Sequence, residues 1–161
     1  MKNFLFTCWE GGGNVTPALE AVRRLTTAGH RVRFMGEDCN RPEAEAAGAE
    51  FVPWKTAPNR KLRIRELQEC KDWAAATPQE GLMHVVRDIW SKPSLAYARD
   101  TIEELRREPA DLVVTGEFLF GVLAGCEAIG QKVAILCVNI RLAPTPGIPP
   151  LGPGFAPAKN D

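Results

Sequence analysis

The chain has 161 residues, of which 45% are hydrophobic and 25% are charged. This size and composition are those of one ordinary globular domain, and they exclude a disordered, collagen-like or membrane-embedded chain. The 20 Lys and Arg residues balance the 20 Asp and Glu residues, which argues against binding to nucleic acid because phosphate contacts normally need a basic excess. No apolar stretch approaches the roughly 18 residues of a membrane span. We therefore expect a neutral domain that lies in the cytoplasm and has no membrane span.

The five cysteines are widely spaced and have neither the C-x-x-C nor the His-pair spacing of a zinc site. We therefore expect no metal site and a reducing, cytosolic compartment. Cys8, Cys126 and Cys137 lie in apolar runs, where a cysteine is usually a small buried hydrophobic residue.

The N-terminal part of the chain predicts a strand, a glycine loop and a helix. The apolar run 4–9 is typical of a buried strand, and residues 10–14 form a tight loop after it. Thr16 is expected to cap the helix that follows, with Pro17 as its first residue, and Gly29 is expected to end it.

The rest of the chain continues this alternation of strands and helices. The predicted elements are a strand at 30–36, a helix at 42–47, a strand at 50–54, two or three helices between 58 and 108 with breaks near Pro78 and Pro93, a strand at 111–115, a helix at 118–129 and a strand at 132–138. Short connections of this kind favour parallel strands with right-handed crossovers. The expected fold is a Rossmann-like, three-layer α/β/α domain with a mostly parallel sheet of about five strands. Residues 139–161 are rich in Pro and Gly and are expected to be irregular.

Two groups of residues stand where predicted parallel strands end, which is where open α/β sheets bind their ligands. Residues 11–14 follow the first strand, and the N–H groups there suit a ligand at a helix N-terminus. A simple tight turn is the alternative. Glu117 follows the fourth strand on the same edge, where a carboxylate can act as a general base or bind a hydroxyl. Its alternative role is to stabilise the start of the next helix.

The other motifs are weaker. A dinucleotide fingerprint fits the glycines of residues 11–13 and places Glu37 near the ribose, but Thr16 occupies the place of the third glycine. No Walker loop follows the first strand. His30 and His84 have no partner at metal-ligand spacing, so we expect both to be structural or exposed and not metal ligands.

Several stretches resemble, in order and spacing, the N-terminal half of the GT-B glycosyltransferases that use nucleotide sugars, in particular the transferases of macrolides and other natural products. They are residues 4–13, 17–25, 28–32, 46–53, 109–114 and 144–154. The resemblance covers nearly the whole chain. It implies a domain that binds a small hydrophobic acceptor, while a C-terminal domain binds the nucleotide sugar, so no cofactor is expected in this chain.

The resemblance also points to a departure in the catalytic residues. In the family the loop after the first strand typically reads Gly-His-x-x-Pro, and its histidine removes the proton of the acceptor hydroxyl. Residues 13–17 read Gly-Asn-Val-Thr-Pro, so Asn14 stands in the place of the base, and an amide orients a hydroxyl without taking its proton. The aspartate that often backs the histidine would fall on Gly116, with Glu117 one residue further.

Three explanations of this departure are open. Glu117 supplies the base, or the acceptor is acidic enough to need none, or the chain binds the acceptor without turning it over. We adopt the first as the working hypothesis, because Glu117 is expected beside the glycine loop.

The acceptor cleft implied by the resemblance is apolar. Its candidate residues, beside the catalytic candidates Asn14 and Glu117, are Gly12, Gly13, Met83, Trp90, Phe118 and Ile148. For the residues on predicted helices, packing into the core is the alternative. The Pro/Gly segment 139–161 is expected to run along this cleft.

The sequence thus predicts the acceptor-binding domain of an inverting, metal-independent glycosyltransferase, inactive by itself. One alternative is a binding subunit of a split or catalytically silent transferase. Another is a dinucleotide-binding oxidoreductase domain with Glu37 on the ribose. Because the family's first domain usually continues past a segment like 139–161, the chain is expected to stop short of that domain's end.

Overall fold

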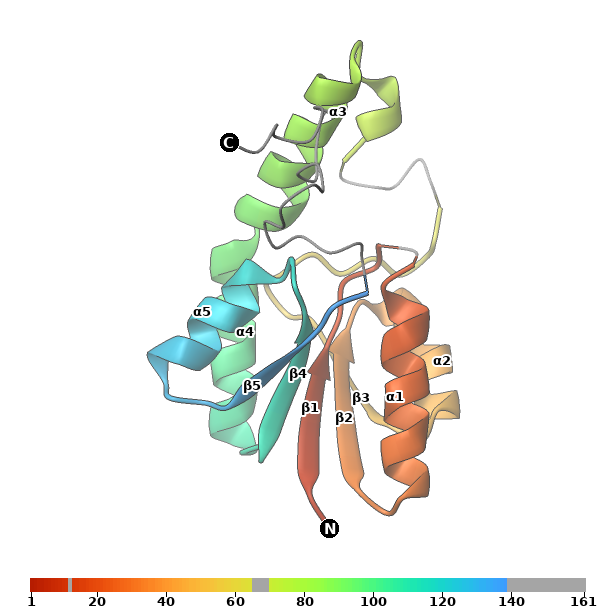
Figure 1. Ribbon diagram of the computed structural model, residues 1–161, viewed down its shortest axis with the longest axis vertical. Coiled ribbons are helices and arrows are strands. Elements are labelled where there is room, and N and C mark those ends of the chain that lie inside the picture. The colour runs from red at the N-terminus through yellow and green to blue at the C-terminus, as the bar shows by residue number, and fades with distance from the viewer. Residues whose placement is uncertain (12, 65–69, 139–161) are drawn as a thin grey trace, which may run out of the picture.

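The computed structural model describes residues 1–11, 13–64 and 70–138. Within them, five strands form one sheet in the order β3-β2-β1-β4-β5 (Figure 1). The strands are β1 (Asn3–Thr7), β2 (Arg31–Gly36), β3 (Glu50–Pro53), β4 (Leu112–Gly116) and β5 (Val133–Leu136). All four pairs of neighbouring strands are parallel. The predicted α/β fold with a parallel sheet is therefore confirmed.

Helices cover both faces of this sheet (Figure 1). They are α1 (Val15–Thr27), α2 (Arg41–Ala46), α3 (Pro78–His84), α4 (Ser94–Arg107) and α5 (Phe120–Ala128), with short 3₁₀ segments η1 (Asp38–Asn40) and η3 (Asp72–Ala74) and the π-helical η4 (Val85–Ser91). Successive side chains of β1 point to opposite faces of the sheet, as in any β-strand. Leu5 packs with Tyr97 and Val122 of α4 and α5, and Phe6 packs with Val22 of α1.

Helices α4 and α5 approach one another closely because two glycines of α5 face α4. A Cβ atom on Gly121 would lie 1.9 Å from the carbonyl oxygen of Ser94, and one on Gly125 would lie 3.1 Å from that of Ala98. Only residues without a side chain allow backbones to pack at this distance. This contact fixes the start of α5, and with it the loop that follows β4.

The start of α1 differs from the prediction. The helix begins at Val15 after Asn14, whose side chain makes no capping hydrogen bond, so the expectation that Thr16 is the cap is wrong. Pro17 is tolerated inside the first turn because the first four N–H groups of a helix have no partner within the helix. The end of α1 is as predicted, since Gly29 has a φ of 80°, a conformation that glycine adopts without strain.

The helical middle has both predicted breaks. The break near Pro78 separates η3 from α3; Pro78 starts α3, and Thr77 caps it by accepting a hydrogen bond from Glu80 N at 3.2 Å. From α3 the chain runs directly into η4, and the predicted break near Pro93 separates η4 from α4.

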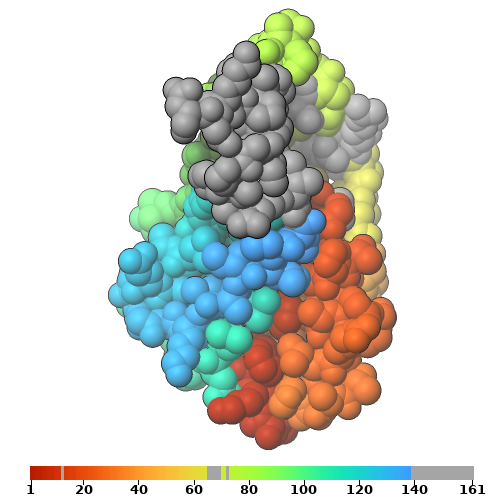
Figure 2. All heavy atoms as spheres, in the orientation of Figure 1, coloured from red at the N-terminus to blue at the C-terminus, as the bar shows by residue number. Residues whose placement is uncertain are grey.

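The cysteines follow the prediction in part. Cys8 and Cys126 are buried, whereas Cys137 is exposed, so its predicted burial is wrong. It follows the edge strand β5, which lies at the surface between α5 and α1 (Figure 2). Exposed edge positions of this kind carry apolar residues without burying them, and Ile135 is another.

The predictions for residues 139–161 lie outside the described residues. Among the residues that are described, no helix combines the length and the apolar character needed to cross a membrane.

Candidate active site

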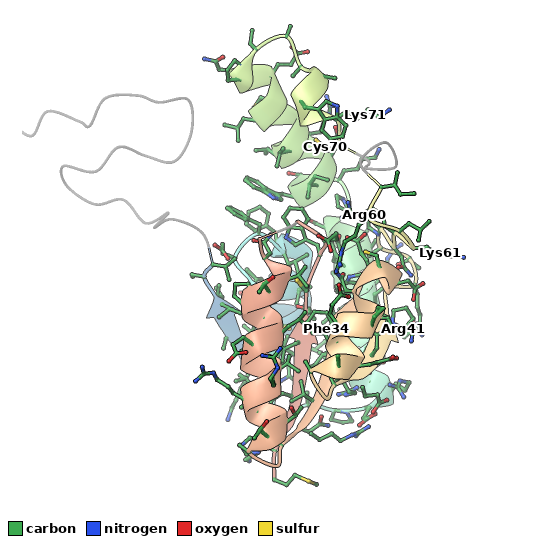
Figure 3. All side chains as sticks on the ribbon, turned by 90° about the vertical axis from the view of Figure 1, so that its right-hand side faces the viewer. Phe34, Arg41, Arg60, Lys61, Cys70 and Lys71 are labelled. Carbon is green, nitrogen blue, oxygen red and sulfur yellow. The ribbon has the colours of Figure 1, made fainter. Side chains whose placement is uncertain are left out.

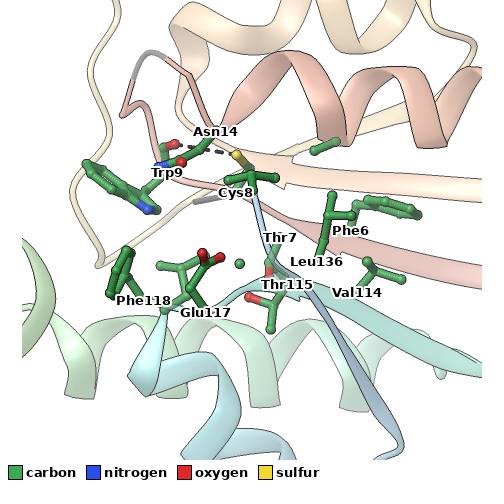
Figure 4. Close-up of a pocket in the computed structure, with 14 residues that line it drawn as sticks. Phe6, Thr7, Cys8, Trp9, Asn14, Val114, Thr115, Glu117, Phe118 and Leu136 are labelled. Atoms are coloured by element: carbon green, nitrogen blue, oxygen red, sulfur yellow. Dashed lines mark hydrogen bonds between the residues drawn. The ribbon is translucent and has the colours of Figure 1, made fainter. Parts of the chain in front are cut away.

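The carboxyl ends of the central strand β1 and its neighbour β4 form a small cavity (Figure 4). It has a volume of about 20 Å³. Its lining residues are Phe6, Thr7, Cys8, Trp9, Asn14, Ala18, Val114, Thr115, Gly116, Glu117, Phe118, Leu119, Leu136 and Val138. This edge is where an open parallel sheet places its ligands.

The structure brings the two catalytic candidates to this cavity. Asn14 comes from the start of α1, and Glu117 comes from the loop between β4 and α5. The N-cap position of α5 is Leu119, not Glu117. In Figure 4 the carboxylate of Glu117 points from the end of β4 toward the side of the cavity where Cys8 and Asn14 lie. The catalytic roles of both residues stay predictions.

Aromatic side chains form a second hollow next to the cavity, with a volume of about 310 Å³. Its lining residues are Trp9, Gly11, Gly13, Asn14, Trp90, Phe118 and Val138. Trp90 and Phe118 are stacked, with ring centroids 4.0 Å apart and planes at 5°. We call this hollow the aromatic pocket. It unites three predicted site residues, Gly13, Trp90 and Phe118, with Asn14.

The other candidate residues lie elsewhere. Met83 is 59% exposed on α3 and lines neither the cavity nor the aromatic pocket, so its place in the acceptor cleft stays a prediction. The residue of α3 that is buried is Gly81, and the helix turns Met83 away from that side. Gly12 and Ile148 lie outside the described residues.

A larger cavity of about 360 Å³ lies beyond Trp9 and was not predicted. Its lining residues are Trp9, Glu10, Gly11, Glu37, Pro58, Arg60, Arg63, Cys70, Val85, Asp88, Ile89, Pro93 and Tyr97. We call it the arginine cavity. Trp9 and Gly11 line both this cavity and the aromatic pocket. The spacing of apolar residues in the sequence did not indicate this cavity, because most of its lining residues belong to loops.

Glu37 anchors the wall of the arginine cavity. Its side chain is only 2% exposed and accepts hydrogen bonds from Glu10 N at 2.7 Å, from Arg60 N at 3.1 Å and from Arg60 Nε at 2.6 Å. Arg60 Nη2 donates to the other carboxylate oxygen at 3.0 Å and also to the carbonyl oxygen of Glu10. Figure 3 shows Arg60 between α2 and the segment with Cys70.

This arrangement overturns the ribose-binding alternative for Glu37. A carboxylate that binds a ribose must have its oxygens open to the ligand, but those of Glu37 are bound by Arg60 and by backbone N–H groups. Burial acts to lower the pKa of Arg60, but the hydrogen bond and charge of Glu37 outweigh it and raise the pKa. The pair is therefore a charged structural contact.

A second layer of polar contacts holds Glu10. Its carboxylate accepts hydrogen bonds from Asn40 Nδ2 at 2.6 Å and from Arg63 Nε at 2.8 Å. Arg63 also bonds Glu43, and this hydrogen bond lowers the pKa of the Glu43 carboxyl. The backbone of Glu10, which follows Trp9, is thus held by two charged side chains, because its N–H donates to Glu37 and its carbonyl oxygen accepts from Arg60.

Cys8 lies in the wall of the small cavity but is not a nucleophile at neutral pH. Burial, together with the nearby charges of Glu10 and Glu37, raises the pKa of its thiol to about 12. Across the described ranges, no group of three or more His, Cys, Asp or Glu side chains could hold a metal ion.

The fold and the site define a class: an open, Rossmann-like α/β domain with polar residues at the carboxyl ends of its central strands. No protein-family model matches the sequence. The curated relative 4′-demethylrebeccamycin synthase of Lentzea aerocolonigenes is 29% identical over 150 residues, which are 93% of this chain and 35% of that protein.

Solved structures agree with this relationship. The calicheamicin glycosyltransferase CalG4 is 27% identical, with a TM-score of 0.62 over 85% of this chain and 32% of its own. SsfS6, a glycosyltransferase of Streptomyces sp. SF2575, is 21% identical, with a TM-score of 0.59 over 89% of this chain and 40% of its own, and supports the fold. The chain is thus related to the natural-product glycosyltransferases of the GT-B fold, and it spans about a third of the length of the curated relative.

Proposed function

We propose that the chain is the acceptor-binding domain of an inverting glycosyltransferase, which moves a sugar from a nucleoside diphosphate sugar to a hydroxyl group of a small hydrophobic molecule. The observation that carries the proposal is the meeting of Asn14 and Glu117 at one cavity, directly beside the aromatic pocket. The related glycosyltransferases support the reaction class.

The acceptor occupies the hollows on either side of Trp9. The volumes of about 310 Å³ and 360 Å³ are in the range of small-molecule sites, which are mostly apolar with a few polar groups. The stacked Trp90 and Phe118 offer a flat apolar wall, and ring faces of this kind bind planar or apolar ligands. The reacting hydroxyl enters toward Asn14 and Glu117.

The chemistry assigned to these residues is a single displacement. The carboxylate of Glu117 takes the proton of the acceptor hydroxyl, and the hydroxyl oxygen attacks the anomeric carbon of the sugar. The bond between that carbon and the diphosphate oxygen breaks on the opposite face, so the nucleoside diphosphate leaves with the bonding electrons. The Asn14 amide orients the hydroxyl, since it can donate and accept hydrogen bonds but cannot act as the base.

The donor is assigned to a part of the protein outside this sequence. SsfS6 has been solved with thymidine diphosphate, and VinC, another structural neighbour at 20% identity, with dTDP. A thymidine diphosphate sugar is therefore the first donor to test. This chain spans only about a third of the curated relative, which leaves room for the donor-binding residues.

The test is the Glu117→Gln variant in the natural gene product, assayed with TDP-glucose, other TDP- and UDP-sugars and a panel of hydrophobic alcohols and phenols. Loss of a general base costs about 10²–10⁴ in turnover, so kcat should fall by at least about 100-fold while the KM for the acceptor stays close to that of the wild type. Glu127→Gln, at an exposed position of α5, is the matched control.

Two results would contradict the proposal. An unchanged kcat in Glu117→Gln for alcohol acceptors would remove Glu117 as the base. A wild-type protein that binds acceptors but forms no glycoside with any donor of the panel would favour the binding subunit, a function that the amide at position 14 also allows.

A further inference from the structure

Two threonine hydroxyls are buried without a partner at the floor of the small cavity. Thr7 ends β1 and Thr115 lies in β4, and the two are register partners in neighbouring strands. Thr7 is 3% exposed and Thr115 is 1% exposed. In the described part of the chain, neither Oγ1 atom has a hydrogen-bond partner.

Such a pair is costly in a dry core. A buried hydroxyl without a partner costs about 1–3 kcal/mol, and valine has nearly the same shape and an equal or better preference for strands. Two residues earlier on each strand, on the same face, stand the apolar side chains of Leu5 and Val113. The two hydroxyls therefore indicate that a polar molecule is bound at this end of the strands.

The cavity is large enough for a water molecule. Its volume of about 20 Å³ exceeds the roughly 10–15 Å³ that one water molecule needs. The walls also supply the 2–4 polar partners that a buried water requires, because Thr7, Thr115, Asn14 and Glu117 all line it. Figure 4 places the two threonines side by side, next to Glu117.

We propose that Thr7 and Thr115 bind one ordered water molecule, and that this water holds the Glu117 carboxylate in place. One threonine hydroxyl donates to the water, and the water donates to the other hydroxyl and to the carboxylate. Thr7 and Thr115 are thus positioning residues that act through Glu117. The binding of the water stands by itself, whereas its effect on turnover rests on the proposed function.

A crystal structure of the natural gene product tests the water directly. We expect density within hydrogen-bond distance of both Oγ1 atoms, and its loss in the Thr7→Val/Thr115→Val variant. A wild-type map that resolves other buried waters but has none here would overturn the proposal.

Unfolding equilibria give a second, independent measurement. If a water satisfies the hydroxyls, each Thr→Val change removes a hydrogen bond and should raise the unfolding constant about fivefold. If the site is dry, each change removes an unsatisfied group and should leave the unfolding constant unchanged or lower it, which would contradict the proposal.

Turnover then tests the positioning role. We expect Thr115→Val and Thr7→Val to lower kcat about tenfold with KM unchanged and to shift the pH profile of kcat, because they remove a hydrogen bond that reaches a charged group. Thr115→Ser and Thr7→Ser keep the hydroxyl and should restore the wild-type profile. The control is Thr101→Val, since Thr101 is equally buried but its hydroxyl donates to the carbonyl oxygen of Tyr97 at 2.8 Å.

The Glu117→Gln background separates this proposal from the proposed function. If the water acts through Glu117, Thr115→Val should cost much less in that background than in the wild type. Equal costs in the two backgrounds, or serine variants as impaired as the valine variants, would refute the positioning role. An unimpaired Glu117→Gln variant would instead refute the base and leave the water site standing.

Discussion

Replacing Glu37 by Gln is expected to destabilise the domain strongly, although the change preserves shape. The carboxylate is 2% exposed and accepts two hydrogen bonds from the Arg60 side chain, at 2.6 Å and 3.0 Å. The variant removes the negative charge and leaves the guanidinium of Arg60, 17% exposed, facing an amide whose NH₂ group cannot accept its second bond.

The magnitude follows from the burial of the two partners. Breaking a buried ion pair by removing one partner costs about 3–5 kcal/mol. Because Arg60 retains some contact with solvent and a bond to the Glu10 carbonyl oxygen, we expect about 2–3 kcal/mol here. The control is Glu50→Gln. Glu50 pairs with Arg31 at 2.6 Å, but the side chains are 49% and 44% exposed, and exposed pairs contribute about 0–1 kcal/mol.

Urea unfolding of the natural gene product, followed by tryptophan fluorescence, measures both variants. Glu37→Gln should lower the midpoint at an unchanged slope, which identifies a loss of stability. It should also weaken acceptor binding, because Glu37 holds the backbone of Glu10 next to Trp9. A loss no larger than that of Glu50→Gln would refute the reasoning that burial determines the strength of this pair.

Two further predictions concern packing and thiol chemistry. Gly121→Ala should destabilise the domain by about 3 kcal/mol or more, as severe overpacking does, because its Cβ would meet the Ser94 carbonyl oxygen at 1.9 Å; Gly125→Ala, whose Cβ would keep 3.1 Å, should cost less in the same unfolding assay. Iodoacetamide at pH 8 should modify the exposed Cys137 and spare Cys8, whose burial raises the pKa of its thiol to about 12. Peptide mass mapping measures the ratio, and equal labelling of folded protein would contradict it.

Local patterns in the sequence were sufficient for most of the fold. Strands and helices were predicted from runs and spacings of apolar residues, and their order from the short connections between them. The helix ends were marked by Gly29, Gly48 and Gly130, all of which have φ between 68° and 87° in the structure. These signals are reliable because they depend on the conformation of one residue and not on distant contacts.

The charged contacts inside the domain could not be predicted. Arg33 is completely buried in β2 and is paired with Glu104 of α4, although the two residues are far apart in the sequence. Glu37 and Arg60 meet in the same way across a loop. No local pattern assigns one carboxylate to one arginine among the 20 acidic and 20 basic residues of the chain, because tertiary packing selects the pair.

The sequence predicted the site residues whose positions follow from the order of the strands, but not those whose positions depend on the rotation of a helix about its axis. Asn14 and Glu117 meet because β1 and β4 are neighbours and both end at the same edge. The directions of the Met83 and Trp90 side chains depend on how the helix is rotated about its own axis. Because α3 continues into the π-helical η4, the number of residues per turn changes along this helix, and a single apolar period does not describe it. Trp90 therefore faces the aromatic pocket and Met83 faces solvent.

The geometry at the end of β4 explains why Glu117 does not simply replace the family's aspartate. Successive strand residues point to opposite faces, so a side chain at position 116 would leave the sheet on the side of Val114, which packs in the core cluster with α1. That is the side from which a histidine at position 14 would need support. Under the proposed function, Glu117, one residue further, supplies a carboxylate as the base in place of the family's imidazole.

This difference can be tested by rebuilding the dyad. A Cβ on Gly116 would meet no atom within 4 Å, so Asn14→His with Gly116→Asp should be accommodated and should restore turnover to the inactive Glu117→Gln variant. The acid limb of its pH profile should then lie at higher pH than that of the wild type, because an imidazole holds its proton to a higher pH than a carboxylate in model peptides. The control is Asn14→His without Gly116→Asp, which should recover less. Identical acid limbs in the wild type and the rebuilt variant would contradict a carboxylate base.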